Sequence, residues 1–152
     1  MHLLITDCVK KKRLKASELE IDVDGDGPIE KEHFVQLNVI IASHYKHYGD
    51  GKFSDGVRKL MILRDHYNLP DNLYEVPRSI NMEKRNITDY YIKRFNRNEI
   101  ASRLDISNEL AVYIQSAYRF VAAHIELQGS ETVSNVREDF MEYVNWLESL
   151  CQ

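Results

Sequence analysis

Two groups of basic residues are the parts of this sequence best suited to bind a charged partner. One is a run near the amino terminus, and the other is interleaved with Tyr90, Tyr91 and Phe95. The members are Lys10, Lys11, Lys12, Arg13 and Lys15 in the first, and Lys84, Arg85, Lys93, Arg94, Arg97 and Arg103 in the second. Lysine and arginine neutralise phosphates, and aromatic rings stack on bases. We therefore predict nucleic-acid binding by the first run and by Lys93, Arg94 and Arg97, and we place Tyr91 and Phe95 in the core because of their helical spacing.

The sequence holds parts of two metal motifs but completes neither. The segment 22–29 follows the first half of a calcium loop, yet the position of the closing glutamate is His33, and Glu32 comes one place early. His44 and His47 can share one face of a helix, but no cysteine or carboxylate completes a zinc site with them. We expect no metal and no other cofactor, and we assign the two histidines to packing or to contacts between protomers.

Catalytic motifs are missing from the sequence. We find no nucleophile elbow, no phosphate-binding glycine loop and no metalloprotease helix motif. Scattered serine, histidine and aspartate residues do not define a triad without geometry. The prediction is a protein that is not an enzyme and has no catalytic residue.

A helix-turn-helix pattern covers residues 97–120 in weak form. Asp105 occupies the place of the usual turn glycine, and the second helix would offer Asn108 and Glu109 with no cation before Arg119. A carboxylate close to phosphates opposes binding, so we expect poor base reading from this helix.

Length and composition indicate an ordinary globular protein. The 152 residues are 43% apolar and 29% charged, and the formal net charge is −4, which argues against a generally basic nucleic-acid coat. Cys8 and Cys151 have neither metal spacing nor the density of a disulfide scaffold. The apolar start precedes its basic run, which reverses the order of a signal peptide, and no segment is long enough to cross a bilayer. We expect a cytoplasmic protein without a membrane partner.

The front of the chain is expected to hold one strand and two helices. Residues 17–23 alternate, with Leu19, Ile21 and Val23 on one face and carboxylates on the other, and they predict a strand. Helices are predicted at roughly 28–48 and 54–67. An alternative register makes 34–39 the strand and shortens the first helix to 41–48.

The rest of the chain divides into an irregular segment and a helical module. Residues 69–86 show no periodicity and predict a linker or irregular packing. From residue 87 to 152 we expect helices beginning near Thr88, at 100–104, at 108–127 with Ser107 as cap, and from Ser130 or Thr132 onward. The apolar stripes of the last two helices predict these core residues: Leu110, Ile114, Ala117, Tyr118, Val121, Ile125, Val133, Val136, Phe140, Tyr143, Val144, Leu147 and Leu150.

The two helices of the front half carry a family resemblance. It rests on these residues: Ile41, Ala42, Ser43, His44, His47, Gly49, Ser54, Asp55 and Arg58. The helix pair resembles the ribbon-helix-helix superfamily, and the segment 41–61 is similar to the amino-terminal oligomerisation segment of the SeqA family of replication-sequestration proteins. The resemblance implies that two chains pair one strand each and interlock their helices. In the SeqA family this segment joins protomers, while a separate domain holds DNA.

Together these features predict a mainly α fold with one short N-terminal strand. A ribbon-helix-helix-like dimerisation module at 1–68 would precede a bundle-like helical module at 87–152. The expected function is a homodimeric, DNA-associated regulator or adaptor whose helical half binds DNA or another protein. The expected dimer interface comprises Leu19, Ile21, Val57, Leu60 and Met61. The alternative is a protein-binding inhibitor of the phage or plasmid type, which uses an acidic surface that includes Glu138, Asp139, Glu142 and Glu148.

Overall fold

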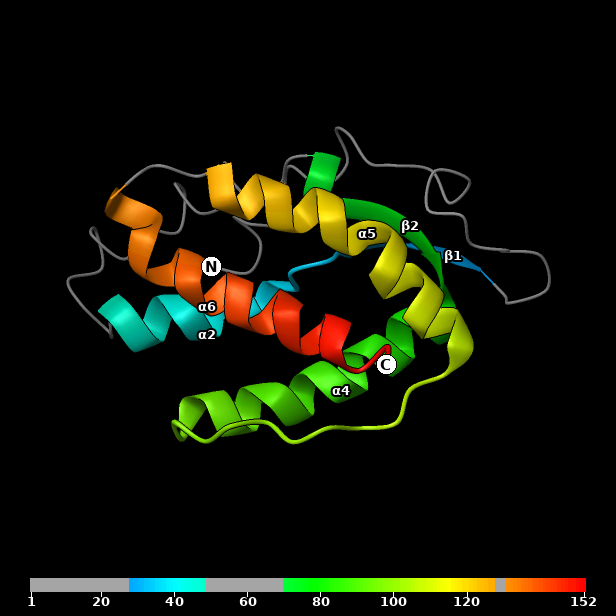
Figure 1. Ribbon diagram of the computed structural model, residues 1–152, viewed down its shortest axis with the longest axis horizontal. Helices are drawn as coiled ribbons and strands as arrows, with labels where there is room; N and C mark the ends of the chain where they lie inside the picture. Colours follow the sequence, from blue (N-terminus) through cyan, green and yellow to red (C-terminus); the bar gives the residue numbers. More distant parts are fainter. Residues whose placement is uncertain (1–27, 49–69, 128–130) are drawn as a thin grey trace.

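Helices make up most of the part of the chain that the computed structural model describes, namely residues 28–48, 70–127 and 131–152 (Figure 1). The elements in chain order are β1 (Ile29–His33), α2 (Leu37–Tyr48), the 3-10 turn η2 (Pro70–Asn72), β2 (Leu73–Pro77), α4 (Arg78–Asn96), α5 (Asn108–Leu127) and α6 (Glu131–Ser149). The predicted mainly α fold class is confirmed. None of the described helices has both the length and the apolar composition that a bilayer crossing requires.

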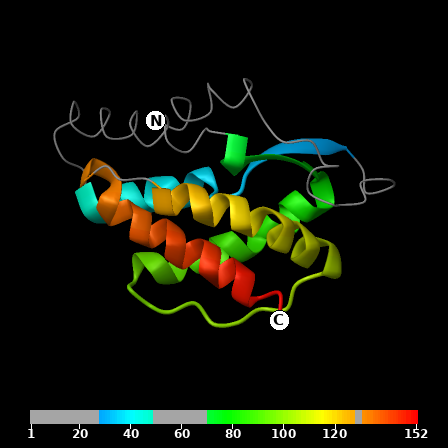
Figure 2. The same ribbon diagram turned by 45° about the horizontal axis from the view of Figure 1, so that its top comes forward.

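A two-stranded antiparallel sheet holds the front of the described chain against the helices (Figure 2). β1 and β2 pair in register from Ile29 opposite Pro77 to His33 opposite Leu73. Just beyond the ladder, the Asn72 side chain accepts a hydrogen bond from the backbone amide of Val35 at 2.8 Å. This side chain continues the pairing where the backbone leaves the sheet and turns into α2.

The start of the predicted helix at 28–48 is wrong, because residues 29–33 form β1 and the helix begins at Leu37. The alternative strand at 34–39 is also wrong, since Leu37 to Val39 are helical. β1 is stabilised by a strand that lies far along the chain, and a reading of local periodicity does not detect such a partner. The predicted strand at 17–23 and the predicted helix at 54–67 lie outside the described residues.

The described part of the segment 69–86, residues 70–86, is not irregular, contrary to the sequence-based expectation. It contains β2 and the first half of α4. β2 is buried on both faces, so its residues do not alternate between apolar and polar. The inward face of α4 includes Asn81, Lys84 and Thr88, and these polar side chains interrupt the apolar stripe by which a helix is recognised.

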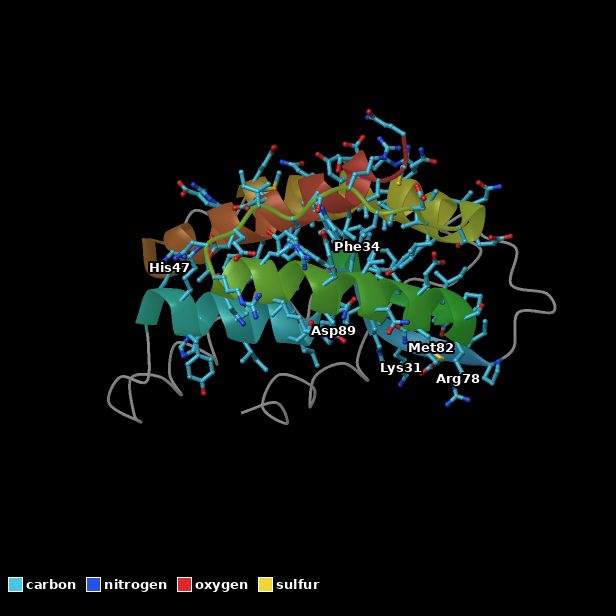
Figure 3. The ribbon with its side chains drawn as sticks, turned by 90° about the horizontal axis from the view of Figure 1, so that it is seen from below. Lys31, Phe34, His47, Arg78, Met82 and Asp89 are labelled. Atoms are coloured by element: carbon cyan, nitrogen blue, oxygen red, sulfur yellow. The ribbon has the colours of Figure 1, made fainter. Side chains whose placement is uncertain are left out.

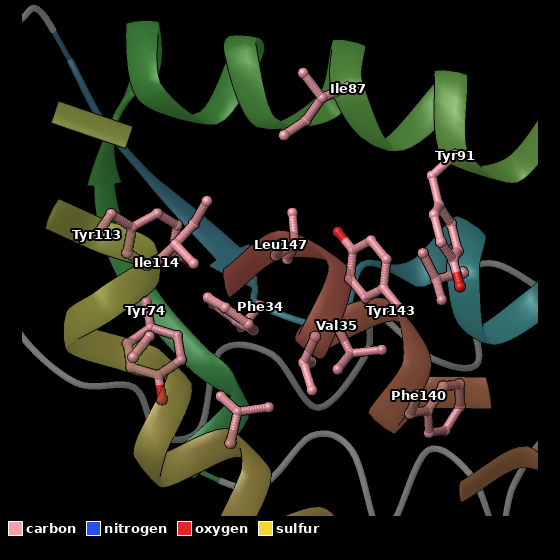
Figure 4. Packing of buried hydrophobic residues seen from close by; sticks show 14 of the residues in the cluster. Phe34, Val35, Tyr74, Ile87, Tyr91, Tyr113, Ile114, Phe140, Tyr143 and Leu147 are labelled. Carbon is pink, nitrogen blue, oxygen red and sulfur yellow. The ribbon is translucent and has the colours of Figure 1, made fainter. Parts of the chain in front are cut away.

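One hydrophobic cluster joins the front of the described chain to all three long helices (Figure 4). Phe34 lies edge-on to Tyr113 of α5, with ring centres 5.7 Å apart, and Tyr91 of α4 lies 5.3 Å from Tyr143 of α6. The predicted core positions of α5 and α6 are buried, except that Tyr118 is half-buried and the side chain of Val133 lies outside the described set. Tyr91 and Phe95 are buried as predicted. The division into modules stays a prediction, but residues 34–40 share a core with the helical half.

The connection between α4 and α5 is extended and contains no helix. The helix expected at 100–104 is therefore wrong, and Ile100 is 93% exposed. Without that helix, residues 97–120 do not have helix-turn-helix geometry. Ser107 caps α5 as predicted, because its hydroxyl accepts a hydrogen bond from the Leu110 amide at 3.2 Å, and Glu83 of α4 binds the Ser107 amide at 2.8 Å.

Candidate functional site

A buried lysine is the centre of the polar network that fixes β1 to the helices. Lys84 has no exposed surface, and its Nζ donates to Glu32 Oε1 at 3.1 Å, to the Phe34 carbonyl at 2.6 Å and to Gln36 Oε1 at 3.2 Å. Lys84, which the sequence groups with the cations suited to a charged partner, is therefore not available at the surface. A buried ammonium requires such partners because an unpaired charge in the interior is strongly unfavourable.

Three hydroxyl groups complete this network. Tyr113 of α5 donates to the second carboxylate oxygen of Glu32. The Thr88 hydroxyl lies 2.9 Å from Gln36 Oε1 and 2.8 Å from the hydroxyl of Tyr143 on α6. The network thus connects β1, the start of α2 and all three long helices.

Burial shifts the pKa values of these groups away from their ordinary ranges. Desolvation raises the pKa of Glu32, and Lys84 opposes this shift as the nearest positive charge. Desolvation also lowers the pKa of Lys84, and Glu32 opposes that shift in turn. The pKa values of Tyr113 and Tyr143 lie well above 10 because both phenols are enclosed, and the negative charge of Glu32 raises them further. Both phenols are therefore neutral, and the network positions the surrounding elements.

A groove of about 370 Å³ lies beside the network, between β1, the start of α2 and α4. Lys31, Asn38, Arg85 and Asp89 line it together with the more deeply placed Asn81. Asn38 donates to Asp89 across 3.2 Å, which ties the start of α2 to α4. Figure 3 shows Lys31 and Asp89 on the same side of the molecule.

The floor of the groove contains an unsatisfied amide. Asn81 has no exposed surface, and both its Nδ2 and its Oδ1 lack a hydrogen-bond partner. More than nine in ten buried polar groups in proteins have a partner, so this amide is exceptional. Sequence reasoning missed Asn81 because a single asparagine in a helix gives no signal of burial.

The outward face of α4 carries a series of cations. Arg78, Arg85 and Lys93 are exposed on it, and Arg97 is exposed at its C-cap. Figure 3 shows Arg78 at one end beside Met82. Two of the three predicted binding residues in this region, Lys93 and Arg97, thus lie at the surface.

Arg94, the third predicted binding residue of α4, is half-buried. Its guanidinium carbon lies 3.3 Å from the ring centre of Tyr90, and it donates to the Tyr90 carbonyl at 3.0 Å. A guanidinium stacked on an aromatic ring has a fixed orientation, so Arg94 is held against its own helix.

Charge is distributed unevenly among the long helices. α4 contains five lysines and arginines and two carboxylates, whereas α5 and α6 together contain two arginines and seven carboxylates. In Figure 1, α4 follows one long edge of the fold and α5 the opposite edge, with α6 between them. Most cations of the long helices therefore belong to a different helix from most of the carboxylates, although the chain as a whole is acidic.

The predicted acidic face of α6 is only partly available. Glu138 and Glu142 are exposed, but Asp139 is buried, so the prediction that it lies on the surface is wrong. Its Oδ2 accepts from the Ser43 hydroxyl at 2.6 Å and lies 2.6 Å from His47 Nε2. Asp139 therefore joins α6 to α2.

Several predicted sites fall outside the described residues. They are the basic run Lys10, Lys11, Lys12, Arg13 and Lys15 and the interface residues Leu19, Ile21, Val57, Leu60 and Met61. Within the described ranges, no three His, Cys, Asp or Glu side chains are grouped so that they could hold a metal ion.

Comparison with known proteins gives no independent guide to this site. No family model, no curated protein and no solved structure matches the chain. The resemblance to ribbon-helix-helix proteins thus rests on the sequence motif alone.

Proposed function

We propose that this protein is a non-enzymatic, cytoplasmic regulator or adaptor that associates with nucleic acid through the outward face of α4. The observation that carries the proposal is the series of exposed cations on that face, Arg78, Arg85, Lys93 and Arg97. They extend from the first residue of a 19-residue helix to its C-cap, and the helix is about 28 Å long. Phosphates recur along a nucleic-acid strand, so cations spread over such a length can contact several of them.

The surroundings of these cations support the same function. Only Asp89 brings an exposed carboxylate to the described part of α4, and its charge is partly satisfied by Asn38. Arg78 lies 3.4 Å from Glu30 but remains largely exposed. An ion pair at the surface contributes little to stability, so Arg78 can exchange Glu30 for a phosphate at small cost.

Binding is tested best with paired substitutions on the face of α4. Lys93→Ala with Arg97→Ala removes two exposed cations, and Arg119→Ala on α5 is a control for removal of a cation elsewhere. Fluorescence anisotropy with labelled single-stranded and duplex DNA measures affinity as salt is varied. The slope of log affinity against log salt should fall by about 0.7 to 0.9 for each phosphate that the variant no longer neutralises, and Arg119→Ala should leave it unchanged. If the unaltered protein binds no nucleic acid at low salt, the proposal fails.

The basic run at 10–15 is proposed as a second contact to the same strand. Replacing Lys10, Lys11, Lys12 and Arg13 together by alanine should weaken binding and flatten its salt dependence further. If the run acts independently of α4, its effect on the slope adds to that of the α4 substitutions. An unchanged slope would assign the run to a solvated segment without a role in binding.

Self-association is part of the proposal, since two copies would present two cationic faces. We propose that Leu19, Ile21, Val57, Leu60 and Met61 bury against a second chain. Each such side chain stabilises by roughly 1.5 to 3 kcal/mol when it is fully buried. Leu60→Asp should therefore convert a dimer to a monomer, as measured by light scattering. An unaltered mass for the variant, or a monomeric parent protein, would exclude this interface.

A second candidate function follows from the acidic helices. The carboxylates of α5 and α6, including the exposed Glu138 and Glu142, could engage a basic protein surface. Glu138→Gln with Glu142→Gln would abolish such binding and leave nucleic-acid affinity intact or stronger. Two results together would favour this candidate. The protein would bind no nucleic acid, and it would bind a basic protein in a salt-sensitive manner that the two substitutions abolish.

A further inference from the structure

We propose that the groove between β1, α2 and α4 holds one unpaired nucleotide, with Asn81 bound to the base and Lys31 and Arg85 at the phosphate. The inference rests on the proposed function and deepens it by giving α4 a site for a single nucleotide. The same nucleotide chemistry is present in a free mononucleotide and in a single strand, and the experiment below separates these two sources.

Asn81 supplies the first argument. Its side chain offers two N–H donors and one carbonyl acceptor, and in this structure none of them is used. An asparagine amide matches the donor and acceptor pair on one edge of adenine, to which it can form two hydrogen bonds. The amide atoms are themselves covered, so a base reaches them by displacing side chains that line the groove.

The charges around the groove supply the second argument. Lys31 from β1 and Arg85 from α4 line it, and both are exposed. Two carboxylates also line the groove, but Glu32 is paired with Lys84 and Asp89 accepts a hydrogen bond from Asn38. Leu37 and Asn38, the first residues of α2, also line the groove, and the first turn of this twelve-residue helix contains no acidic residue. The amino-terminal end of a helix favours an anion, so a phosphate near Lys31 and Arg85 meets the positive end of α2 as well.

The size and place of the groove select the kind of ligand. A volume of about 370 Å³ is at the lower end of the range for small-molecule sites and suits one nucleotide. A base inside a duplex is stacked and paired, and entering such a groove would require its removal from the stack. Arg85 belongs both to the groove and to the cationic face of α4, so a strand lying along α4 passes the mouth of the groove.

The proposal can be tested by titrating the full-length protein with four probes. They are AMP, CMP, a short oligodeoxyadenylate and the duplex formed from that strand and its complement, each followed by isothermal calorimetry. The oligodeoxyadenylate should bind more tightly than the duplex at equal salt. If the groove accepts free mononucleotides, AMP should bind more tightly than CMP. If the strand binds but AMP does not, the site is specific for a nucleotide within nucleic acid.

Asn81→Leu removes the amide at similar volume and should weaken adenine binding about tenfold or more. Because it also removes a buried unsatisfied group, the variant should melt at the same temperature or higher, which excludes unfolding as the cause of weaker binding. Lys31→Ala should weaken all probes that reach the groove. Lys93→Ala is the matched control on α4, and it should weaken the strand and the duplex alike without changing the preference for adenine.

The outcomes separate this inference from the proposed function. If strands bind but Asn81→Leu changes neither affinity nor preference, the groove is not the nucleotide site and the cationic face alone remains. If AMP binding depends on Asn81 but neither strand nor duplex binds, the groove is a nucleotide site and the proposed nucleic-acid function is wrong. If no probe binds, or an acidic peptide occupies the groove in place of all four, the inference is overturned.

Discussion

Lys84 provides the sharpest test of how this fold is stabilised. Lys84→Met keeps an unbranched apolar stem of similar length but removes the ammonium. Glu32 would then retain only the hydrogen bond from Tyr113, while the carbonyl of Phe34 and the amide oxygen of Gln36 would lose a donor. The variant therefore leaves a buried carboxylate that has lost its ion-pair partner, with Arg85 as a weaker source of positive charge.

The expected loss of stability is large. Breaking a buried ion pair by removal of one partner costs about 3 to 5 kcal/mol, against a total of about 5 to 15 kcal/mol for a domain. For a chain of this size the melting temperature should fall by about 6 to 20 °C. The double variant Lys84→Met with Glu32→Gln removes the stranded charge and keeps an acceptor for Tyr113. It should recover at least about 1 kcal/mol of that loss.

The pH dependence gives a second signature of the same pair. Burial raises the pKa of Glu32 above its ordinary value of 4.5, and without Lys84 it should rise further. Between that ordinary value and the raised one, the folded state of Lys84→Met binds a proton that the unfolded state does not. The stability of the single variant should therefore increase as pH falls from 7 toward 5, relative to the double variant.

Urea unfolding followed by circular dichroism at pH 5, 6 and 7 measures both effects. The parent protein, the single variant and the double variant are compared at each pH, and the midpoint is interpreted only where the slope is unchanged. A single variant within about 1 kcal/mol of the parent, with no pH dependence relative to the double variant, would refute the buried ion pair.

Three further predictions concern other contacts of the core and the helix ends. Tyr113→Phe removes the donor to Glu32 and should cost about 1.5 to 3 kcal/mol in urea unfolding, whereas an unchanged midpoint would show that Glu32 does not depend on the phenol. Ser107→Ala should cost about 0.5 to 2 kcal/mol through loss of the α5 cap, whereas Ser107→Thr keeps a hydroxyl that can cap α5 and donate to Glu83, and should retain most of the stability; equal losses in both variants would contradict a capping role. Burial raises the pKa of the Cys151 thiol to about 11. In a Cys8→Ser background, alkylation of Cys151 by iodoacetamide at pH 8, followed by peptide mapping, should therefore be much slower in the native protein than in urea, and it should accelerate as the pH approaches 11. Equal alkylation rates in native and unfolded protein would disprove the raised pKa.

The helical half of the fold could be predicted because its signals are local. α5 and α6 place apolar residues at helical spacing, and residues such as Leu110 and Phe140 are buried as that spacing requires. Ser107 is identifiable as a cap because capping involves only the next few residues. Each of these inferences needs nothing from elsewhere in the chain.

The sheet and the groove could not be predicted, because distant residues determine them. Four of the five residues of β1 are charged or histidine, and the sequence Ile-Glu-Lys-Glu-His resembles an exposed helical turn. Glu32 is buried only because Lys84, far along the chain, neutralises it. Because this pairing is long-range, the sequence alone does not distinguish Lys84 from the surface cations. For the same reason it does not show that the face of α4 with Asn81 points inward.

Within the described residues, most cations of the long helices lie on α4 and most carboxylates on α5 and α6, which gives this part of the molecule an electric dipole. In the field of a polyanion such a molecule experiences a torque that turns α4 toward the strand before contact, while α5 and α6 are repelled. Productive encounters should therefore be enriched over random collisions, and the enrichment should vanish once the Debye length, about 10 Å at 0.1 M salt, becomes shorter than the fold. Salt would then slow association more strongly than it hastens release.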